Sequence, residues 1–317
     1  MSDTASLSVI IVNYNTASLV LAHIEAIRQE IRSFTNAHIF VVDNASPDGD
    51  LQILQGALDG VTDATVIDAG RNLGFAGGNN LAYSRVKAQG TDYVLVLNPD
   101  AKPLPNSIVR LASFLDENQK AAIAGAQIVD PSGTLSPSYF QFPTIARELA
   151  GVSDTGFIKR LVGAAHDYSK KADTAIRVDW VSGSAFVLRQ SALDQFMDDG
   201  FFLYYEETDM MRGLHREGWE IWHCPDAEVM HIGGVATGVQ PAREARRRMP
   251  EYWFDSWRRY FVKNHGRPYA LAAAIAKMSG LIIAYVGGFL RGVPVRYPEK
   301  YLSDIFRQCF LATLMGR

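Results

Sequence analysis

Short apolar runs alternate with helical patterns along the first 130 residues of the chain. The runs have the length and the Val, Ile and Leu content of buried strands, and they cover 7–12, 38–42, 64–67, 93–97 and 122–129. Apolar residues between the first two runs recur at helical spacing, at Val20, Ile24, Ile27 and Ile31. Strands that alternate with helices at intervals of about 25–30 residues are typical of βαβ units. The pattern therefore predicts an α/β fold with a mainly parallel sheet flanked by helices.

The pattern changes after Asp130. Residues 131–179 are polar, rich in Gly, Ser and Thr, and poorly periodic. They predict a long connection that lies over the carboxyl ends of the strands, where a ligand site of such a sheet is expected. A further apolar strand is predicted over 181–188, followed by a helix around 191–196.

Basic and aromatic residues interleave between 243 and 261. The residues of this pattern are Arg243, Arg246, Arg247, Arg248, Arg258 and Arg259, with Tyr252, Trp253, Phe254, Trp257, Tyr260 and Phe261. A basic aromatic helix of this kind suits a membrane interface. Nucleic acid is the weaker alternative, and we do not expect it as a partner.

The stretch 269–290 contains one charged residue, Lys277, so a transmembrane helix has to be weighed. The gain from its apolar residues is nearly offset by one Lys at roughly +3 kcal/mol, which makes insertion marginal. A stripe of apolar residues runs along one side of the predicted helix: Leu271, Ile275, Met278, Ile282, Tyr285 and Phe289. We favour a helix that lies in the interface. Packing on the protein's own core or on a second copy in a homodimer is the alternative.

The charge is distributed unevenly along the 317 residues, although the net charge is only -3. Residues 243–317 contain 14 Lys/Arg and 5 Asp/Glu, a balance of +9, so the first 242 residues hold 17 and 29, a balance of -12. We therefore predict an α/β domain over 1–242 and a basic, amphipathic helical extension over 243–317. The basic extension favours contact with an anionic membrane surface.

The cysteine content and the N-terminus favour a cytoplasmic location. Cys224 and Cys309 provide neither a disulfide framework nor metal-ligand spacing, which fits a reducing compartment. The N-terminal residues have no basic segment before an apolar one, so we expect no signal peptide.

The first candidate for chemistry is the end of the 93–97 strand, which stops at Asn98-Pro99-Asp100 because Pro99 cannot donate a ladder hydrogen bond. Ligands of open α/β sheets bind outside the carboxyl ends of the strands. Asp100, with the Asn98 amide two residues earlier, is a candidate ligand for a hard cation that also binds the oxygens of a phosphate group. An ordinary turn with Asp as a turn residue is the alternative.

The second candidate is a group of carboxylates at Glu206, Glu207 and Asp209, directly behind an aromatic run. Carboxylates near a core are costly unless something compensates them, and neighbours raise one another's pKa, which suits a general base. A solvated acidic start of a helix is the alternative, and both can hold.

Two weaker signals accompany these carboxylates. His231 ends a short apolar strand before Gly233-Gly234, which makes it a candidate metal ligand beside Asp100, although a lone His is more often structural. The glycine-rich stretch 70–80 precedes a helix, whose N-terminus can receive phosphate, or it is only a tight strand-to-helix turn.

Taken together, the chain resembles the inverting family 2 glycosyltransferases with the GT-A fold, specifically their rhamnosyltransferase-like branch, over roughly residues 7–265. The motifs that carry the resemblance are Ser8–Asn15, Val42–Ser46, Asn72–Asn80, Leu97–Ala101, Ser182–Ala185, Tyr205–Asp209 and Trp253–Gly266. In this branch Asn-Pro-Asp stands where other GT-A enzymes have Asp-x-Asp.

The resemblance implies a donor site. Asp43 and the loop Asn13–Asn15 would hold the nucleobase and ribose, with Asn72, Phe75 and Asn79 nearby. Beside Asn98, Asp100 would bind Mg²⁺ or Mn²⁺ that bridges the donor's diphosphate, and His231 would complete the metal site.

The resemblance also implies the base. Glu207 matches the Asp of the family's Glu-Asp pair and would be the general base, with Asp209 as the second candidate. Gly213 stands where the family usually has Arg, and Arg212 lies one position earlier, so the role of that Arg does not carry over.

The implied activity is inverting, metal-dependent transfer of L-rhamnose from dTDP-rhamnose to a hydroxyl of a glycan or polyprenyl-linked glycan. It would serve cell-surface polysaccharide synthesis at the inner face of the plasma membrane. One alternative is a sugar-phosphate nucleotidyltransferase, whose usual Gly-rich, basic loop is replaced here by Asn13-Tyr14-Asn15. Another is a catalytically silent scaffold that binds glycans.

Overall fold

The computed structural model describes residues 5–163, 171–234 and 247–316. The chain forms two compact units, described separately below. The first contains Met1–Gln141, Tyr168–Phe202 and Glu206–Val239, and the second contains Phe142–Asp167, Leu203–Tyr205 and Gln240–Arg317. The predicted boundary lies between residues 242 and 243, whereas the structure divides the chain between Val239 and Gln240. Residues 142–167 and 203–205 also belong to the second unit.

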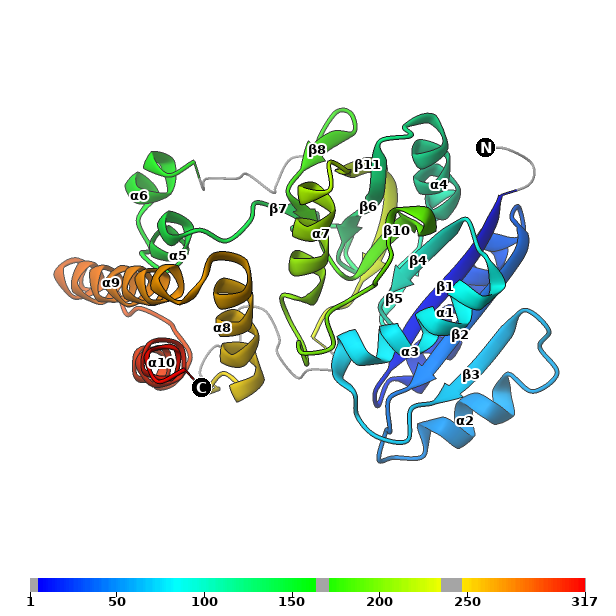
Figure 1. Ribbon diagram of the computed structural model, residues 1–317, viewed down its shortest axis with the longest axis horizontal. Helices are drawn as coiled ribbons and strands as arrows, with labels where there is room; N and C mark the ends of the chain where they lie inside the picture. Colours follow the sequence, from blue (N-terminus) through cyan, green and yellow to red (C-terminus); the bar gives the residue numbers. More distant parts are fainter. Residues whose placement is uncertain (1–4, 164–170, 235–246, 317) are drawn as a thin grey trace. The chain divides into compact units, whose positions relative to one another are not determined.

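The first unit is built on a mixed, mainly parallel sheet (Figure 1). The strand order is β3 (Ala64–Asp68), β2 (Thr35–Asp43), β1 (Ser6–Asn13), β4 (Tyr93–Leu97), β10 (Ala185–Arg189), β6 (Ala121–Val129), β11 (Glu220–His231) and β5 (Ala101–Pro103). β8 (Ile176–Val178) pairs with β11 outside this order. β1, β2, β3 and β4 are parallel, whereas β10 runs antiparallel to both β4 and β6. β7 (Tyr139–Phe140) and β9 (Trp180–Val181) form a separate small pair.

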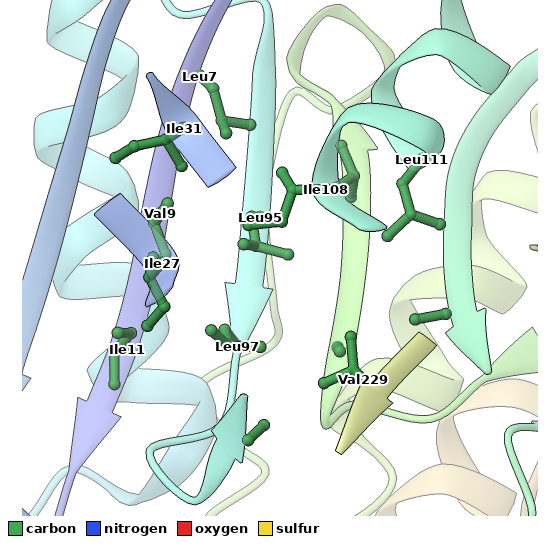
Figure 2. Close-up of a cluster of buried hydrophobic side chains, with 14 of the residues drawn as sticks. Leu7, Val9, Ile11, Ile27, Ile31, Leu95, Leu97, Ile108, Leu111 and Val229 are labelled. Carbon is green, nitrogen blue, oxygen red and sulfur yellow. The ribbon is translucent and has the colours of Figure 1, made fainter. Parts of the chain in front are cut away.

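Helices cover both faces of this sheet, because its strands are apolar on both sides. Alternate residues of β1 divide between two clusters, with Val9 in one and Ile10 in the other. The first cluster includes side chains from α1 (Ala17–Ile31) and α4 (Ser107–Glu117), and Figure 2 shows Ile27 beside Val9 and Ile108 beside Leu95. The second includes side chains from α3 (Gly74–Gln89) and α7 (Glu206–Arg216). α2 (Asp50–Ala57) adds Leu54 to the first cluster.

The predicted strands and helices of the first 130 residues are confirmed, but three later predictions are wrong. The connection 131–179 is not irregular throughout, because it contains α5 (Ile145–Gly151), α6 (Gly156–Leu161), β7 and β8. The predicted strand 181–188 is interrupted at Ser182–Ser184. The predicted helix at 191–196 is only a short 3₁₀ turn, η1 (Gln190–Ala192), because the Met197 backbone that follows is bonded to the Asn80 side chain instead of to a helix.

The second unit is helical. Besides α5 and α6 it contains α8 (Glu251–His265), α9 (Arg267–Arg291), α10 (Tyr301–Asp304), the π-helix η2 (Ile305–Leu311) and α11 (Ala312–Leu314). The expectation that α8 presents its aromatic residues to a membrane is wrong. Phe254, Trp257, Tyr260 and Phe261 are fully buried and form the core of this unit.

Two of the arginines in the same pattern are also paired within the unit. Arg248 forms an ion pair with Asp304 (2.7 Å), and Arg258 pairs with Asp255 (2.8 Å). Arg243 and Arg246 lie outside the described residues. The basic aromatic pattern therefore describes a packed helix, which has the same period as a helix at a lipid surface.

α9 buries one face and exposes the other. Lys277 lies inside the unit, with its Nζ 2.7 Å from Glu148 Oε2, and the side chains of both residues are 8% exposed. Trp257 Nε1 donates to the same carboxylate oxygen (3.0 Å). Ile275, Ile282 and Phe289, from the predicted apolar stripe, are exposed. Among the described residues, α9 is the helix that has the length and composition to cross a membrane.

Candidate active site

The polar side chains that follow β1 and β2 form one hydrogen-bonded cluster. These paired parallel strands end at the same edge, with Asn13 opposite Asp43. Asn13 Nδ2 donates to Asp43 Oδ1 (2.9 Å) and to Asp50 Oδ2 (2.9 Å). Asn13 is fully buried, so its amide holds the Asp43 carboxylate in place.

Ser46 connects Asp43 to the loop after β1. Its Oγ donates to Asp43 Oδ1 (2.7 Å) and accepts a hydrogen bond from the Asn15 backbone (3.0 Å). Asn15 has a φ of 54°, in the left-handed region that Asn tolerates, and its side chain is exposed. The structure therefore brings Asn13, Asn15 and Asp43 together.

Asn44 ties this cluster to the glycine-rich stretch. Its Nδ2 donates to Asn72 Oδ1 (3.1 Å) and to the Gly74 carbonyl (3.1 Å), and its Oδ1 accepts from the Leu73 backbone (2.9 Å). Asn72 Oδ1 also accepts a hydrogen bond from the Gly74 backbone (2.9 Å). Asn72 is thereby fixed beside the end of β2.

The first turn of α3 holds the chain segment that leads toward α7. The Phe75 backbone donates to the Phe202 carbonyl (2.7 Å), and Gly74 has a φ of 71°. A Cβ at Gly74 would clash with that carbonyl, so the approach requires glycine here. Asn79, which is fully buried, donates from Nδ2 to the Phe75 carbonyl (2.9 Å). Phe75 is thus fixed from two sides.

His231 lies beside Asp100 because β11 pairs with β5, which places His231 opposite Ala101. His231 Nε2 is 3.1 Å from Asp100 Oδ1, and the Asn98 amide is 3.3 Å from the same nitrogen. The Gly233 backbone donates to Asp100 Oδ2 (3.0 Å). Burial acts to raise the pKa of Asp100, but the hydrogen bonds from His231 and Gly233 outweigh burial and hold its pKa below the usual range. An ionised carboxylate, an imidazole and an amide therefore converge at the end of β4.

The predicted carboxylates lie in the first turn of α7, where the helix dipole favours negative charge. Glu206 and Asp209 are buried, and Glu207 is half-buried. The Oε2 atoms of Glu206 and Glu207 are shielded from solvent and have no hydrogen-bond partner among the described residues. Burial raises the pKa of Glu207 to about 7. The pKa of Glu206 is raised well above its usual range, mainly by burial and to a smaller extent by the neighbouring Glu207 carboxylate.

Glu207 lies over the segment that precedes β10. A Cβ placed on Gly183 would be 3.3 Å from Glu207 Oε1, so the carboxylate is in contact with this glycine. The neighbouring Ser184 carbonyl accepts a hydrogen bond from the Asn98 backbone (2.9 Å). The antiparallel pairing of β10 with β4 therefore connects Glu207 to the edge that carries Asp100.

The chain enters α7 through two residues in an unfavourable backbone conformation. Tyr204 and Tyr205 have φ values of 72° and 70°. This region is strained for aromatic residues, at roughly 1–3 kcal/mol each, and such strain clusters at functional sites. Glu206 and Glu207 follow immediately.

Sequence reasoning missed the residues that hold the site together. Asn44, Asp50 and Asn80 were not predicted to be site residues. Asn44 directly follows the predicted site residue Asp43, so its position could have indicated it. Asp50 and Asn80 act through partners 33 and 117 residues away, which local patterns do not reveal.

Comparison with known proteins gives a family and two sequence relatives. A model of glycosyl transferase family 2 matches residues 8–177. An N-acetylglucosaminyl-diphospho-decaprenol L-rhamnosyltransferase of Mycobacterium tuberculosis (strain H37Rv) is 28% identical over 215 residues, which cover 64% of this chain and 69% of the relative. The rhamnosyltransferase WbbL of Escherichia coli K12 is 27% identical over 169 residues, or 50% of this chain and 60% of WbbL.

A solved structure has a similar fold. GalNAc-T7, solved with UDP, GalNAc and Mn²⁺, superposes with a TM-score of 0.52 at 15% identity. The superposition covers 95% of this chain and 58% of that one, so this chain spans less than two thirds of the solved chain.

Proposed function

The chain belongs to glycosyl transferase family 2, whose model matches more than half of it, and on that basis we propose that it transfers L-rhamnose from dTDP-rhamnose with inversion at the anomeric carbon. It is a glycosyltransferase of the rhamnosyltransferase-like branch, and its first unit has the predicted GT-A fold. Rhamnose as the donor sugar is supported by the names of two relatives, one from M. tuberculosis and one from E. coli.

The acceptor in our proposal is a hydroxyl of a glycan, in particular a polyprenyl-linked glycan in cell-surface polysaccharide synthesis. The name of the M. tuberculosis relative supports this choice, because it gives N-acetylglucosaminyl-diphospho-decaprenol as the molecule that receives L-rhamnose. An enzyme with such an acceptor works at the inner face of the plasma membrane. The basic extension 243–317 is the part of the chain that we assign to the anionic lipid surface.

One observation carries the reaction: the end of β4 joins the group of Asn98, Asp100 and His231 to the carboxylate of Glu207 through the Ser182–Ser184 segment. The cluster around Asp43 lies at the ends of the neighbouring strands. We assign Asp43, Asn15, Asn72 and Phe75 to the nucleoside of the donor. Asn13 and Asn79 are fully buried and hold these residues in place.

A divalent cation, Mg²⁺ or Mn²⁺, fits the residues at Asp100. The described residues contain no group of three or more His, Cys, Asp or Glu side chains arranged around a metal site. Asp100 and His231, with Asn98 beside them, therefore supply a small ligand set. A cation that shares its ligands between one or two carboxylates, water and substrate phosphates needs no more. Bound there, it would neutralise charge on the departing diphosphate.

Glu207 acts as the general base in this proposal. The acceptor oxygen attacks the anomeric carbon, the bond from that carbon to the diphosphate oxygen breaks, and the hydroxyl proton passes to Glu207. A pKa of about 7 suits this transfer near neutral pH. Attack from the side opposite to the leaving group inverts the anomeric centre. Asp209, one turn into α7, is the second candidate for the base.

The test is a transfer assay with a panel of nucleotide sugars and a polyprenyl-diphosphate-linked N-acetylglucosamine acceptor, with and without EDTA. We expect rhamnosylated product and dTDP from dTDP-rhamnose, and loss of both with EDTA. Release of pyrophosphate instead of nucleoside diphosphate would identify a nucleotidyltransferase. A protein that binds the acceptor but turns over none of the donors would be a scaffold. The matched control is Glu217→Gln, an exposed Glu just beyond α7, which should leave transfer unchanged.

A further inference from the structure

We propose that the second unit docks on an anionic lipid bilayer through one tip, formed by α6 and the C-terminal end of α9. This inference rests on the proposed membrane-linked acceptor and assigns the surface that reaches the lipid. It differs from the pattern in the sequence, which placed the aromatic residues of α8 at the membrane. We name this surface the α6–α9 tip, and its apolar residues are Phe157, Leu161, Phe289, Leu290 and Val293.

These five side chains are between 56% and 86% exposed, and Phe289 is the most exposed of them. Single exposed apolar residues are ordinary on soluble proteins, but large ones that gather in one place mark an interaction surface. α8 differs, because its large aromatic residues fill the core of the unit. The large apolar side chains of the tip are therefore exposed, whereas those of α8 are buried.

The two parts of the tip are held together by the chain around them. Arg291, the last residue of α9, pairs with Asp154, which lies just before α6 (3.4 Å). The Tyr297 hydroxyl donates to the Val152 carbonyl (2.6 Å). Gly280 allows α9 to pack against α5, since a Cβ there would clash with the Leu149 carbonyl. In Figure 1, α6 lies beside α5, and α5 lies along α9.

The charge of the tip indicates what it meets. Residues 154–161 and 289–296 contain the bases Lys159, Arg160, Arg291 and Arg296, and Asp154 is their single acidic residue. Arg291 neutralises that Asp154. Apolar side chains interleaved with basic ones match a bilayer, whose acyl region accepts the former and whose anionic headgroups attract the latter. A protein partner would have to be both apolar and acidic.

The exposed face of α9 extends this surface. Ile275, Ile282 and Phe289 are seven residues apart and therefore share one side of the helix. Lys277 points the other way, into the unit, where Glu148 neutralises it. The helix can thus lie against lipid without placing this charge in the apolar layer.

The test is flotation of the full chain with vesicles of phosphatidylcholine and phosphatidylglycerol, compared with phosphatidylcholine alone. The wild type should float with the anionic vesicles and should be released by high salt, because exposed charges are screened. The double variants Phe157→Ser/Leu161→Ser and Phe289→Ser/Leu290→Ser should each bind at least about tenfold more weakly, since they remove apolar area that enters the bilayer. Ile53→Ser is the matched control, because Ile53 is an exposed Ile on α2 of the first unit. It should float like the wild type.

A second measurement reports insertion directly. Cys224 and Cys309 are both buried, so a Phe289→Cys variant can be labelled selectively with an environment-sensitive dye. Its emission should shift to the blue on addition of anionic vesicles, whereas that of labelled Ile53→Cys should not.

Three results would overturn the proposal. They are a wild type that ignores anionic vesicles, tip variants that float like the control, or tip variants that convert a dimer to a monomer in light scattering without changing flotation. Donor hydrolysis in the absence of vesicles should be equal in the wild type and the tip variants. A wild type that floats but never hydrolyses a donor would refute the proposed function and leave the docking surface intact.

Discussion

Replacement of Glu207 by Gln should abolish transfer and at the same time stabilise the protein at alkaline pH. Burial raises the pKa of Glu207 to about 7 from an ordinary value of 4.5. The folded state therefore prefers the protonated acid, and stability is greatest below pH 4.5. It is lost as the pH rises toward 7, because the folded protein binds the proton more tightly than the unfolded chain does. A Gln at this position has no proton to lose.

The size of the effect follows from the difference between 4.5 and about 7. That pKa difference lowers the free energy of unfolding by roughly 3 kcal/mol at pH 8. At pH 5 it lowers it by about 1 kcal/mol, because Glu207 is still protonated in the folded protein. Between these two pH values Glu207→Gln should therefore gain about 2 kcal/mol relative to the wild type. Glu207 is half-buried, so screening by solvent makes this an upper limit.

Urea unfolding at pH 5 and pH 8 measures this difference, with Glu217→Gln as the exposed control. Comparing the two pH values removes any fixed cost of the new amide. A variant whose gain is the same at both pH values would show that Glu207 does not favour its neutral form. Near-normal transfer by Glu207→Gln, together with loss of transfer in Asp209→Asn, would move the base to Asp209.

Three further predictions concern the cation, the donor and the second unit. Asp100→Asn should weaken Mn²⁺ binding in the presence of dTDP by at least about tenfold in calorimetric titration, and unchanged affinity would remove Asp100 from the metal site. Asn44→Ala should raise the KM for the donor by roughly 5- to 100-fold, because it releases the glycine-rich stretch at a cost of about 1–3 kcal/mol, and an unchanged KM would contradict that role. Lys277→Ala should lower the free energy of unfolding by about 3–5 kcal/mol, because it leaves Glu148 buried without its cation. Lys277→Met combined with Glu148→Leu should cost much less in the same urea titrations, and equal costs would show that the ion pair is not what matters.

The strands and helices of the first 130 residues could be predicted because their information is local. A run such as Tyr93–Leu97 is apolar on both sides, and only a central strand buries both faces. The carboxyl ends of parallel neighbours meet at one edge of the sheet, so the sequence alone could place Asp43 and Asp100 at that edge. His231 was predicted beside Asp100, and the structure places it 3.1 Å away.

The supporting contacts of the site could not be predicted, because their partners are remote in sequence. Asn80 bonds Met197, and the Phe75 backbone bonds Phe202. Neither contact produces a periodic pattern in the sequence, since each depends on how loops cross the edge of the sheet. The failure at 191–196 has the same origin, because the Asn80 side chain supplies the hydrogen bonds that a helix would otherwise have made.

The second unit was harder because hydrophobic periodicity does not reveal what covers an apolar face. The aromatic stripe of α8 would look the same against lipid or against protein, and the structure places it in a protein core. The segment that covers part of this unit, α5, lies in the polar and poorly periodic stretch 131–179, from which no helix was predicted. Glu148, the partner of Lys277, was therefore out of reach of sequence reasoning.

The ion pair between Lys277 and Glu148 also bears on how α9 can meet a membrane. A spanning orientation would remove Lys277 from Glu148 and place it near the centre of the hydrocarbon layer, at roughly 2.5–3.5 kcal/mol. Glu148 would be left without its partner, and if it stayed buried this would add a free-energy cost of about 3–5 kcal/mol. The apolar gain of α9 was already nearly offset by the Lys alone, so the folded pairing makes spanning unfavourable. A helix that keeps Lys277 inward and turns Ile275, Ile282 and Phe289 outward incurs neither cost, which is why we place α9 on the lipid surface and not across it.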